Sequence, residues 1–400
     1  MKIIIYFAVL CLFFPLGFDL SFQEMTITQA ISIVLFPFCV ISLARSKILT
    51  LGGEAGERVF RAGFLVLLVI LLSLYNADYF IDVIRYSSRY IFGLLLAVSI
   101  IIYINDKTSL IMFDRFFIFG CAVIVLVCIS SFFIESLNDL VTHRSGRYQG
   151  FFRHPNSYAI ALSCSLPIVL TKYQTSFGKE RLLYLLALFL HLVAIVLTGS
   201  KFNLFIAIIV FLYVFQINRG VNFSLSRLFI GVLFSSLLSM LMVSAFIYYL
   251  QNFNSALYDK FTSLMNDPFE QETVTDRLEI WEAGVSHSNV FLGYGAGHVP
   301  HYFEFSHLHN TFIDFYFSMG GFGLLALLYF YYSLFHLYVH VRGRELGAAK
   351  SLMVAYSLLP LIYILSNQMS GSMGTATIIV LWAVIGRIIS GINLANTNEA

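Results

Sequence analysis

Residues 311–340 read TFIDFYFSMGGFGLLALLYFYYSLFHLYVH, a run of 30 residues with a single acidic side chain, Asp314. A membrane-spanning helix needs about 20 predominantly apolar residues. Similar runs recur along the chain, in which 59% of the 400 residues are hydrophobic and 12% are charged. An ordinary soluble domain has about 25% charged residues. The composition therefore excludes a soluble globular protein and predicts a polytopic helical membrane protein.

Apolar runs separated by polar breaks predict an all-α fold with about 12 transmembrane helices. The expected spans lie near residues 3–18, 27–44, 60–75, 89–104, 116–134, 156–171, 182–197, 202–215, 228–250, 311–340, 351–366 and 375–392. No small-residue cleavage site follows the first run, so we expect it to stay as an uncleaved span. This divides the chain into nine helices with short loops (1–250), one large loop with short helices (251–310), and three further helices with the C-terminus (311–400).

The basic residues divide unequally between the two sides of this arrangement. The side that holds both termini carries 16 of the 24 Lys and Arg residues. Cytoplasmic loops are enriched in Lys and Arg, so we expect both termini in the cytoplasm and the large loop outside. The net charge of only +2 offers no general basic field for nucleic acid. The basic residues left outside are Arg85, Arg89, Arg144, Arg147, Arg153, Lys201, Lys260 and Arg277.

Four of these external cations form a candidate anion site. Arg147 and Arg153 flank an aromatic loop segment, Lys201 lies in a short break between two spans, and Arg277 lies in the large loop. Arginine can hold a phosphate in a bidentate fork, so cations kept outside against the charge bias indicate an anionic ligand. The alternative is that each is an interfacial anchor or belongs to a local ion pair.

Histidines are crowded at the end of the large loop, at positions 298, 301, 307 and 309. His309 directly precedes a span, and an imidazole with an ordinary pKa of about 6.5 is a natural general base. Asp314 could orient His309 or cap the helix, and His307 and Asn310 are secondary candidates beside them. We expect His298 and His301 to bond to the backbone. No cysteine or carboxylate stands at a ligand spacing, so we predict no metal and no cofactor.

Two further segments of the large loop have a recognisable pattern. Residues 275–283 predict a short helix on which Leu278, Trp281 and Val285 would share one face. Gly293 to Gly297 read Gly-Tyr-Gly-Ala-Gly, which predicts a turn that brings the backbone close to another group. The five cysteines all lie in apolar runs and are expected to be small buried hydrophobes.

Six segments occur in an order that resembles the O-antigen polymerase and O-antigen ligase superfamily of bacterial envelopes. They are Gly150 to Asn156 (GFFRHPN), Thr198 to Lys201 (TGSK), Arg277 to Trp281, Gly293 to Gly297, His307 to Ile313 (HLHNTFI) and Gly320 to Gly323 (GGFG). The resemblance covers about residues 145–325, whereas the first 130 residues contribute only hydropathy. It adds Asn156 to the candidate site residues.

The resemblance implies a metal-independent glycosyltransferase of the bacterial inner membrane, with its active site on the periplasmic side. Its donor would be a glycan on polyprenyl pyrophosphate, embedded among membrane lipids, and a chain-length regulator protein is a partner that the family suggests. Arg277 matches the arginine that contacts the pyrophosphate, and His309 matches the histidine that acts on the acceptor hydroxyl. Lys201 stands where many members have Arg, which keeps the charge but loses the fork.

Three functions stay open at this point. A polymerase transfers a glycan to the sugar hydroxyl of another lipid-linked repeat unit, and a direct displacement would invert the anomeric centre. A ligase transfers finished polymer to lipid A core. We favour the polymerase because Arg144, Arg147 and Arg153 suggest a second anionic donor site. A lipid-linked oligosaccharide flippase is the third reading, disfavoured because ionisable residues are expected to avoid the centres of the spans.

Overall fold

The computed structural model describes most of the chain. The described residues are 1–12, 17–20, 23–26, 53–131, 134–142, 147–152, 155–218, 272–286, 291–303, 308, 310–344, 350–365 and 376–399, with a few positions within 31–41 and 244–258. Almost all of them are helical, which confirms the all-α fold class. The expected spans at 27–44 and 228–250 fall largely outside the described residues.

Thirteen α-helices are described within these ranges. They are α1 Lys2–Cys11, α3 Glu54–Leu72, α4 Phe80–Tyr103, α5 Lys107–Ser130, α6 Glu135–Val141, α7 Pro155–Thr175, α8 Gly178–Leu197, α9 Lys201–Asn218, α12 Glu272–Ser286, α13 Val299–Tyr302, α14 Thr311–Gly343, α15 Lys350–Leu365 and α16 Ala376–Glu399. A 3-10 turn, η1, covers Ser73–Asn76.

Within the described residues, six helical segments are long and apolar enough to cross a membrane. They are Glu54–Asn76, Phe80–Tyr103, Lys107–Ser130, Gly178–Leu197, Thr311–Gly343 and Thr377–Asn396. Lys2–Cys11 and Leu352–Tyr363 are shorter apolar helices. A helical membrane protein is therefore supported, although these segments are fewer than the 12 expected spans.

Three expected boundaries are wrong. The first helix ends at Cys11, and a hairpin of β1 (Gly17–Leu20) and β2 (Gln23–Thr26) follows in place of a span to residue 18. Helix α4 begins at Phe80 and α5 at Lys107, each nine residues before the expected start. Charged residues therefore lie inside both helices, and two of them have distant partners: Asp82 pairs with His301, and Asp114 pairs with Arg387.

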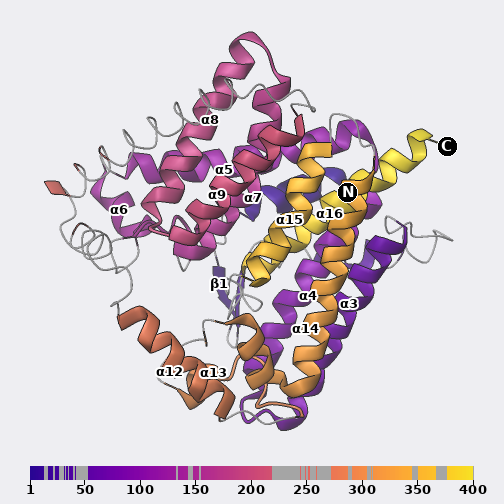
Figure 1. Ribbon diagram of the computed structural model, residues 1–400, viewed down its shortest axis with the longest axis vertical. Coiled ribbons are helices and arrows are strands. Elements are labelled where there is room, and N and C mark those ends of the chain that lie inside the picture. Colours follow the sequence, from indigo (N-terminus) through magenta and orange to yellow (C-terminus); the bar gives the residue numbers. More distant parts are fainter. Residues whose placement is uncertain are drawn as a thin grey trace.

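The packed centre of one half of the molecule is Trp382 of α16, which is fully buried. Its ring lies where Gly63 of α3 and Gly93 of α4 have no side chain: a Cβ at these positions would lie 2.6 and 2.7 Å from it. Rings of Phe60, Tyr90 and Phe330 surround it at centroid distances of 5.6 to 5.9 Å. Small residues of this kind allow membrane helices to approach closely. Helices α3, α4, α14 and α16 thus form one packed group (Figure 1).

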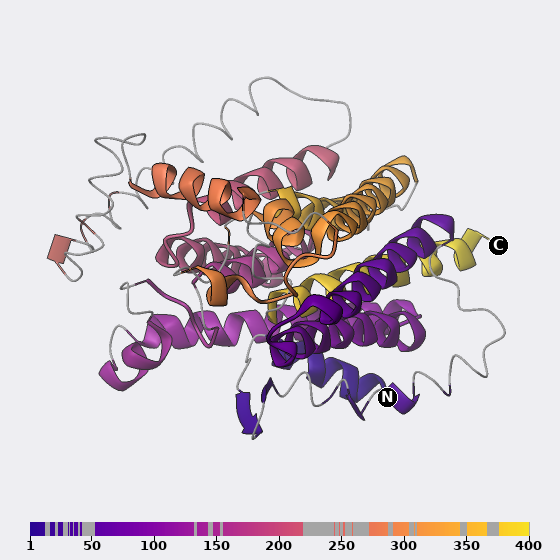
Figure 2. The ribbon, with the colours of Figure 1, turned by 90° about the horizontal axis from the view of Figure 1, so that it is seen from below.

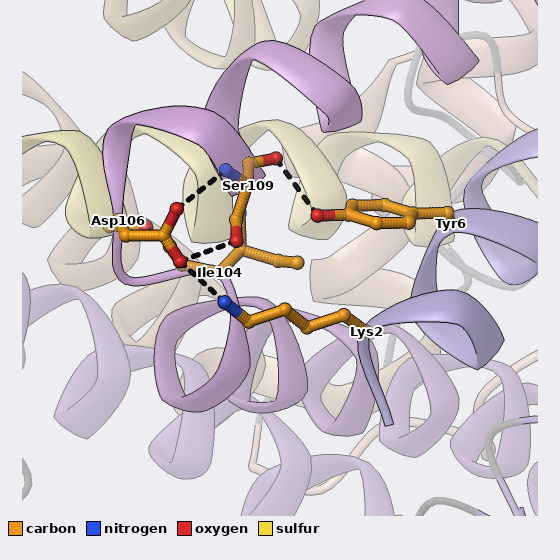
Figure 3. Close-up of polar contacts among 6 residues, drawn as sticks. Lys2, Tyr6, Ile104, Asp106 and Ser109 are labelled. Atoms are coloured by element: carbon orange, nitrogen blue, oxygen red, sulfur yellow. Dashed lines mark hydrogen bonds and ion pairs between the residues drawn. The ribbon is translucent and has the colours of Figure 1, made fainter.

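One end of the bundle holds both termini, and we call it the terminal end. Lys2 forms an ion pair with Asp106, which lies in the turn between α4 and α5 (Figure 3). Asp106 also caps α5, because its Oδ1 accepts a hydrogen bond from the Ser109 amide at 2.8 Å. At the C-terminal side, Ser390 donates to the carbonyl of Ile104 in the same turn.

The opposite end carries the turn at 73–79, the segment 147–152, the break at 198–200 and the segment 291–303, and we call it the loop end. The segment 147–152 contacts the break at 198–200, and the turn at 73–79 contacts the segment 291–303. Helices α12 and α13 also lie at this end, away from the chain termini (Figure 1). Within the region 251–310, the described residues include the short helices α12 and α13, as expected.

An ion pair lies inside the bundle, between Asp114 of α5 and Arg387 of α16. Arg387 Nε donates to Asp114 Oδ1 at 2.9 Å, and Nη2 donates to Oδ2 at 3.0 Å. The two side chains are only 5% and 6% exposed. The expectation that ionisable residues avoid the centres of the spans is therefore wrong, because each charge here is neutralised by the other.

The cysteines follow the sequence prediction where they are described. Cys11, Cys121, Cys128 and Cys164 are all buried and unpaired with one another. Cys121 Sγ contacts Ser165 Oγ at 3.2 Å, which joins α5 to α7. Cys39 lies outside the described residues.

Candidate functional site

Arg147 lies at the loop end and joins three segments of the chain. Its Nε donates to the carbonyl of Thr198 at 2.6 Å, and its Nη2 donates to Asn156 Oδ1 at 2.9 Å. Thr198 ends α8, and Asn156 is the second residue of α7. The guanidinium is thus held beside the first turns of α7 and α9, next to Asn156, which is one of the secondary candidates.

The backbone of the break between α8 and α9 leaves space for the Arg147 side chain. Gly199 has a φ of +61°, and a Cβ there would lie 3.0 Å from Arg147 Nε. The next residue, Ser200, is tied to Thr198 and to Asn203 by hydrogen bonds of 3.2 and 2.8 Å. Only glycine combines this backbone conformation with the close approach of the guanidinium.

The electrostatics of the break favour an anion. Burial lowers the pKa of Arg147, but a guanidinium with an ordinary pKa above 12 stays charged. The amide groups in the first turn of a helix point outward with a partial positive charge. Arg147 and the start of α9 therefore present positive charge at one place, and Nη1 of Arg147 has no partner among the described residues.

Helix α9 begins at Lys201, so this residue occupies the predicted position at the break. Its side chain lies outside the described part of the structure, and Arg153 lies outside it altogether. Of the predicted phosphate ligands, Arg147 is the one whose contacts are defined. Arg277 occupies a position in α12, and its side chain is likewise not described.

Helix α12 lies across the loop end and packs against the start of α14 (Figure 2). Gly284 is its contact point, since a Cβ there would lie 2.9 Å from Leu308 Cδ1 and 3.0 Å from Ile313 Cγ2. Of the predicted face, Leu278 and Val285 are 57% and 51% exposed, whereas Trp281 is half-buried. The contact with the start of α14 uses Gly284 together with Ile280, which borders the cluster of Val299, Leu308 and Phe317.

The glycine-rich turn at 293–297 serves packing between backbones. The amides of Tyr294 and Gly295 donate to the carbonyls of Phe317 and Ser318 at 3.1 and 2.8 Å. A Cβ at Gly293 would lie 2.4 Å from the Met319 amide nitrogen. On the other side, Gly320 interrupts α14 with a φ of +64°. The expected close approach is confirmed, and its partner is the kink in α14.

His298 follows the prediction of a backbone contact, because its Nε2 accepts a hydrogen bond from the Tyr79 amide at 2.8 Å. Burial lowers the pKa of His298, which favours the neutral ring that this acceptor role requires. His301 departs from the prediction: its Nε2 lies 2.7 Å from Asp82 Oδ2, and its ring stacks on Tyr79 at 3.7 Å.

Tyr302 completes the attachment of this segment to α4, since its hydroxyl donates to Asp78 at 2.6 Å. Burial and the neighbouring carboxylate of Asp78 raise the pKa of Tyr302 to about 12, which keeps the phenol a donor. The contacts of His298, His301 and Tyr302 fasten α13 to the start of α4. No sequence pattern indicates these pairs, because the partners are more than 200 residues apart.

Asn310 and Asp314 separate into two roles at the start of α14. Asn310 is the cap, because its Oδ1 accepts hydrogen bonds from the amides of Phe312 and Ile313 at 3.0 and 3.3 Å. Asp314 therefore does not cap the helix and lies buried in its first turn. His307 and His309 lie outside the described residues, whereas Leu308 between them is fully buried.

Among known proteins, the sequence matches no family model and no curated relative.

Proposed function

We propose that this protein is a surface-polysaccharide polymerase of the O-antigen type in the bacterial inner membrane. It transfers a glycan from a polyprenyl-pyrophosphate carrier to a sugar hydroxyl of another lipid-linked repeat unit. The observation that carries the proposal is the position of Arg147, held at the starts of α7 and α9 by Thr198 and Asn156. A cation at helix starts, on a protein with apolar helices, suits the diphosphate of a membrane-embedded lipid.

In the proposed reaction, the acceptor hydroxyl oxygen forms a bond to the anomeric carbon while the bond from that carbon to the diphosphate oxygen breaks. The diphosphate leaves with the electron pair, and its growing negative charge is stabilised by Arg147, Lys201 and Arg277. His309 takes the proton of the hydroxyl. Attack opposite to the leaving group inverts the anomeric centre, and no metal ion is needed for the balance.

The test is transfer by the purified protein in liposomes, with a lipid-pyrophosphate oligosaccharide as donor and acceptor. Arg147→Gln should raise the KM for this lipid about tenfold or more, because it removes a charge-assisted contact. Arg61→Gln is the matched control, since Arg61 is exposed on α3 and pairs with Glu57. Equal kinetics for both variants would remove the anion site from the proposal.

The ligase differs from the polymerase only in its acceptor, so the same liposomes decide between them. A preparation that elongates the lipid-linked glycan without lipid A core supports the polymerase. Transfer that requires lipid A core supports the ligase. Arg277→Ala and His309→Ala should abolish either reaction if the assigned roles are right.

A flippase is a second candidate because of the buried pair Asp114–Arg387. Ionisable residues inside a membrane bundle are typical of transport pathways. Movement of a fluorescent lipid-linked oligosaccharide between leaflets, measured without acceptor, tests this function directly. Flipping that is lost in Arg387→Met and retained in Arg147→Gln would favour the transporter.

A further inference from the structure

Asn203 of α9 is a fully buried residue whose side-chain amide bonds to three other parts of the chain. Its Oδ1 accepts hydrogen bonds from the Tyr363 hydroxyl of α15 at 3.1 Å and from the Ser163 hydroxyl of α7 at 3.4 Å. Its Nδ2 donates to Ser200 Oγ at 2.8 Å. Buried polar groups need such partners, so these bonds fix the orientation of the amide. Asn203 therefore links α7 and α15 to the residue that directly precedes α9.

A continuous chain of hydrogen bonds leads from Asn203 to Arg147. Ser200 accepts the Asn203 bond with its side chain, and its own amide donates to Thr198 Oγ1 at 3.2 Å. The carbonyl of Thr198 accepts from Arg147 Nε at 2.6 Å. The break lies close against the arginine, because a Cβ at Gly199 would stand only 3.0 Å from Arg147 Nε. A movement of Ser200 would thus displace the acceptor that holds the guanidinium.

The second acceptor of Arg147 is Asn156 Oδ1, at the start of α7. Ser163 lies seven residues after Asn156 in the same helix, which is about two turns further along nearly the same face. Asn203 thus bonds to the helix that carries one acceptor of the guanidinium, and to the break that carries the other, Thr198. A change at Asn203 would alter the spacing between these two acceptors.

We propose that Asn203 is a positioning residue for the anion site, which sets the spacing of the two acceptors that hold the Arg147 guanidinium. Its effect on the lipid donor rests on the proposed function, in which Arg147 binds the diphosphate. Its effect on the guanidinium itself depends on no reaction. The two effects can therefore be measured separately.

The first experiment follows Arg147 directly in the detergent-solubilised protein, labelled with arginine that carries an NMR-active nitrogen isotope at Nε. The Arg147 signal is assigned by its loss in Arg147→Lys. Asn203→Leu removes the amide but keeps a buried side chain of similar size. We expect solvent exchange of the Arg147 Nε–H to become about threefold to tenfold faster, as for the loss of one hydrogen bond. An exchange rate equal to that of the wild type would overturn the inference.

A milder pair of variants guards against misfolding of Asn203→Leu. Tyr363→Phe removes only the hydroxyl that donates to Asn203. Tyr356→Phe is the matched control, since Tyr356 is also buried on α15 and its hydroxyl has no hydrogen-bond partner in the described part of the chain. The Arg147 exchange rate should rise in Tyr363→Phe and stay unchanged in Tyr356→Phe. Equal rates in these two variants would also overturn the inference.

The second experiment uses the liposome transfer assay. Asn203→Leu should raise the KM for the lipid donor about threefold to tenfold. In the Arg147→Gln background the same change should raise the KM no further, because the residue that Asn203 positions is absent. An equal rise in both backgrounds would show that Asn203 acts independently of Arg147 and would overturn the inference. Absence of transfer by the wild-type protein would refute the proposed function, and the Arg147 exchange rates would still decide the role of Asn203.

Discussion

The buried pair of Asp114 and Arg387 allows a quantitative prediction about stability. Two charge-assisted hydrogen bonds, at 2.9 and 3.0 Å, join side chains that are almost fully excluded from solvent. Each such bond contributes about 1.5–3 kcal/mol. Removal of one partner also leaves the other as an unpaired charge inside the bundle, and losses of about 3–5 kcal/mol are typical.

We therefore expect Asp114→Leu and Arg387→Met each to lower the free energy of unfolding by about 3–5 kcal/mol. The double variant removes both charges and should lose clearly less than the sum of the two single variants. Unfolding of the detergent-solubilised protein in mixed micelles with increasing SDS measures the three free energies.

Arg61→Met is the control, because it removes an arginine from an exposed pair with Glu57 on α3. Exposed pairs of this kind contribute about 0.5 kcal/mol or less. If the double variant loses as much as the two single variants together, the two charges are not coupled. That result would refute the conclusion that this pair joins α5 to α16.

Three further predictions concern the loop end. Arg147→Lys keeps the charge but loses the two guanidinium hydrogen bonds to Thr198 and Asn156, so the KM for the lipid donor should rise about tenfold. An unchanged KM would exclude a role for the guanidinium geometry. Because burial lowers the pKa of His298, the unfolded chain binds the extra proton below about pH 6.5, and the free energy of unfolding should fall as the pH drops through that value. His298→Gln should weaken this dependence in SDS unfolding at pH 7.5 and 5.5, roughly one unit either side of that value; the same difference between the two pH values in wild type and variant would contradict the prediction. Gly320→Ala, with a φ of +64° and a Cβ that would lie 2.2 Å from a backbone carbon, should cost about 2–5 kcal/mol, whereas Gly343→Ala should cost little.

Part of the fold was predictable because long apolar runs need no partner to be recognised. The runs expected at 156–171, 182–197 and 311–340 correspond to α7, α8 and α14. The starts of α4 and α5 were missed because hydropathy counts a charged residue as loop. Asp114 nevertheless lies inside α5, because its charge is neutralised by Arg387, a residue 273 positions later in the sequence.

The candidate site was likewise predictable only in part from the sequence. The sequence alone determined which residues can hold charge or accept a proton, and it proposed Arg147, Arg153, Lys201 and Arg277 as phosphate ligands, because residue type and the position of a residue between apolar runs carry that information. Only the tertiary structure decided that Arg147 donates a hydrogen bond to the Thr198 carbonyl at the end of α8. It also decided that the absence of a side chain at Gly284 allows α12 to approach Leu308 closely. Contacts between distant segments depend on how the helices pack, which local sequence patterns do not specify. A glycine at a helix crossing has no side chain whose hydrophobicity could indicate that the position is buried.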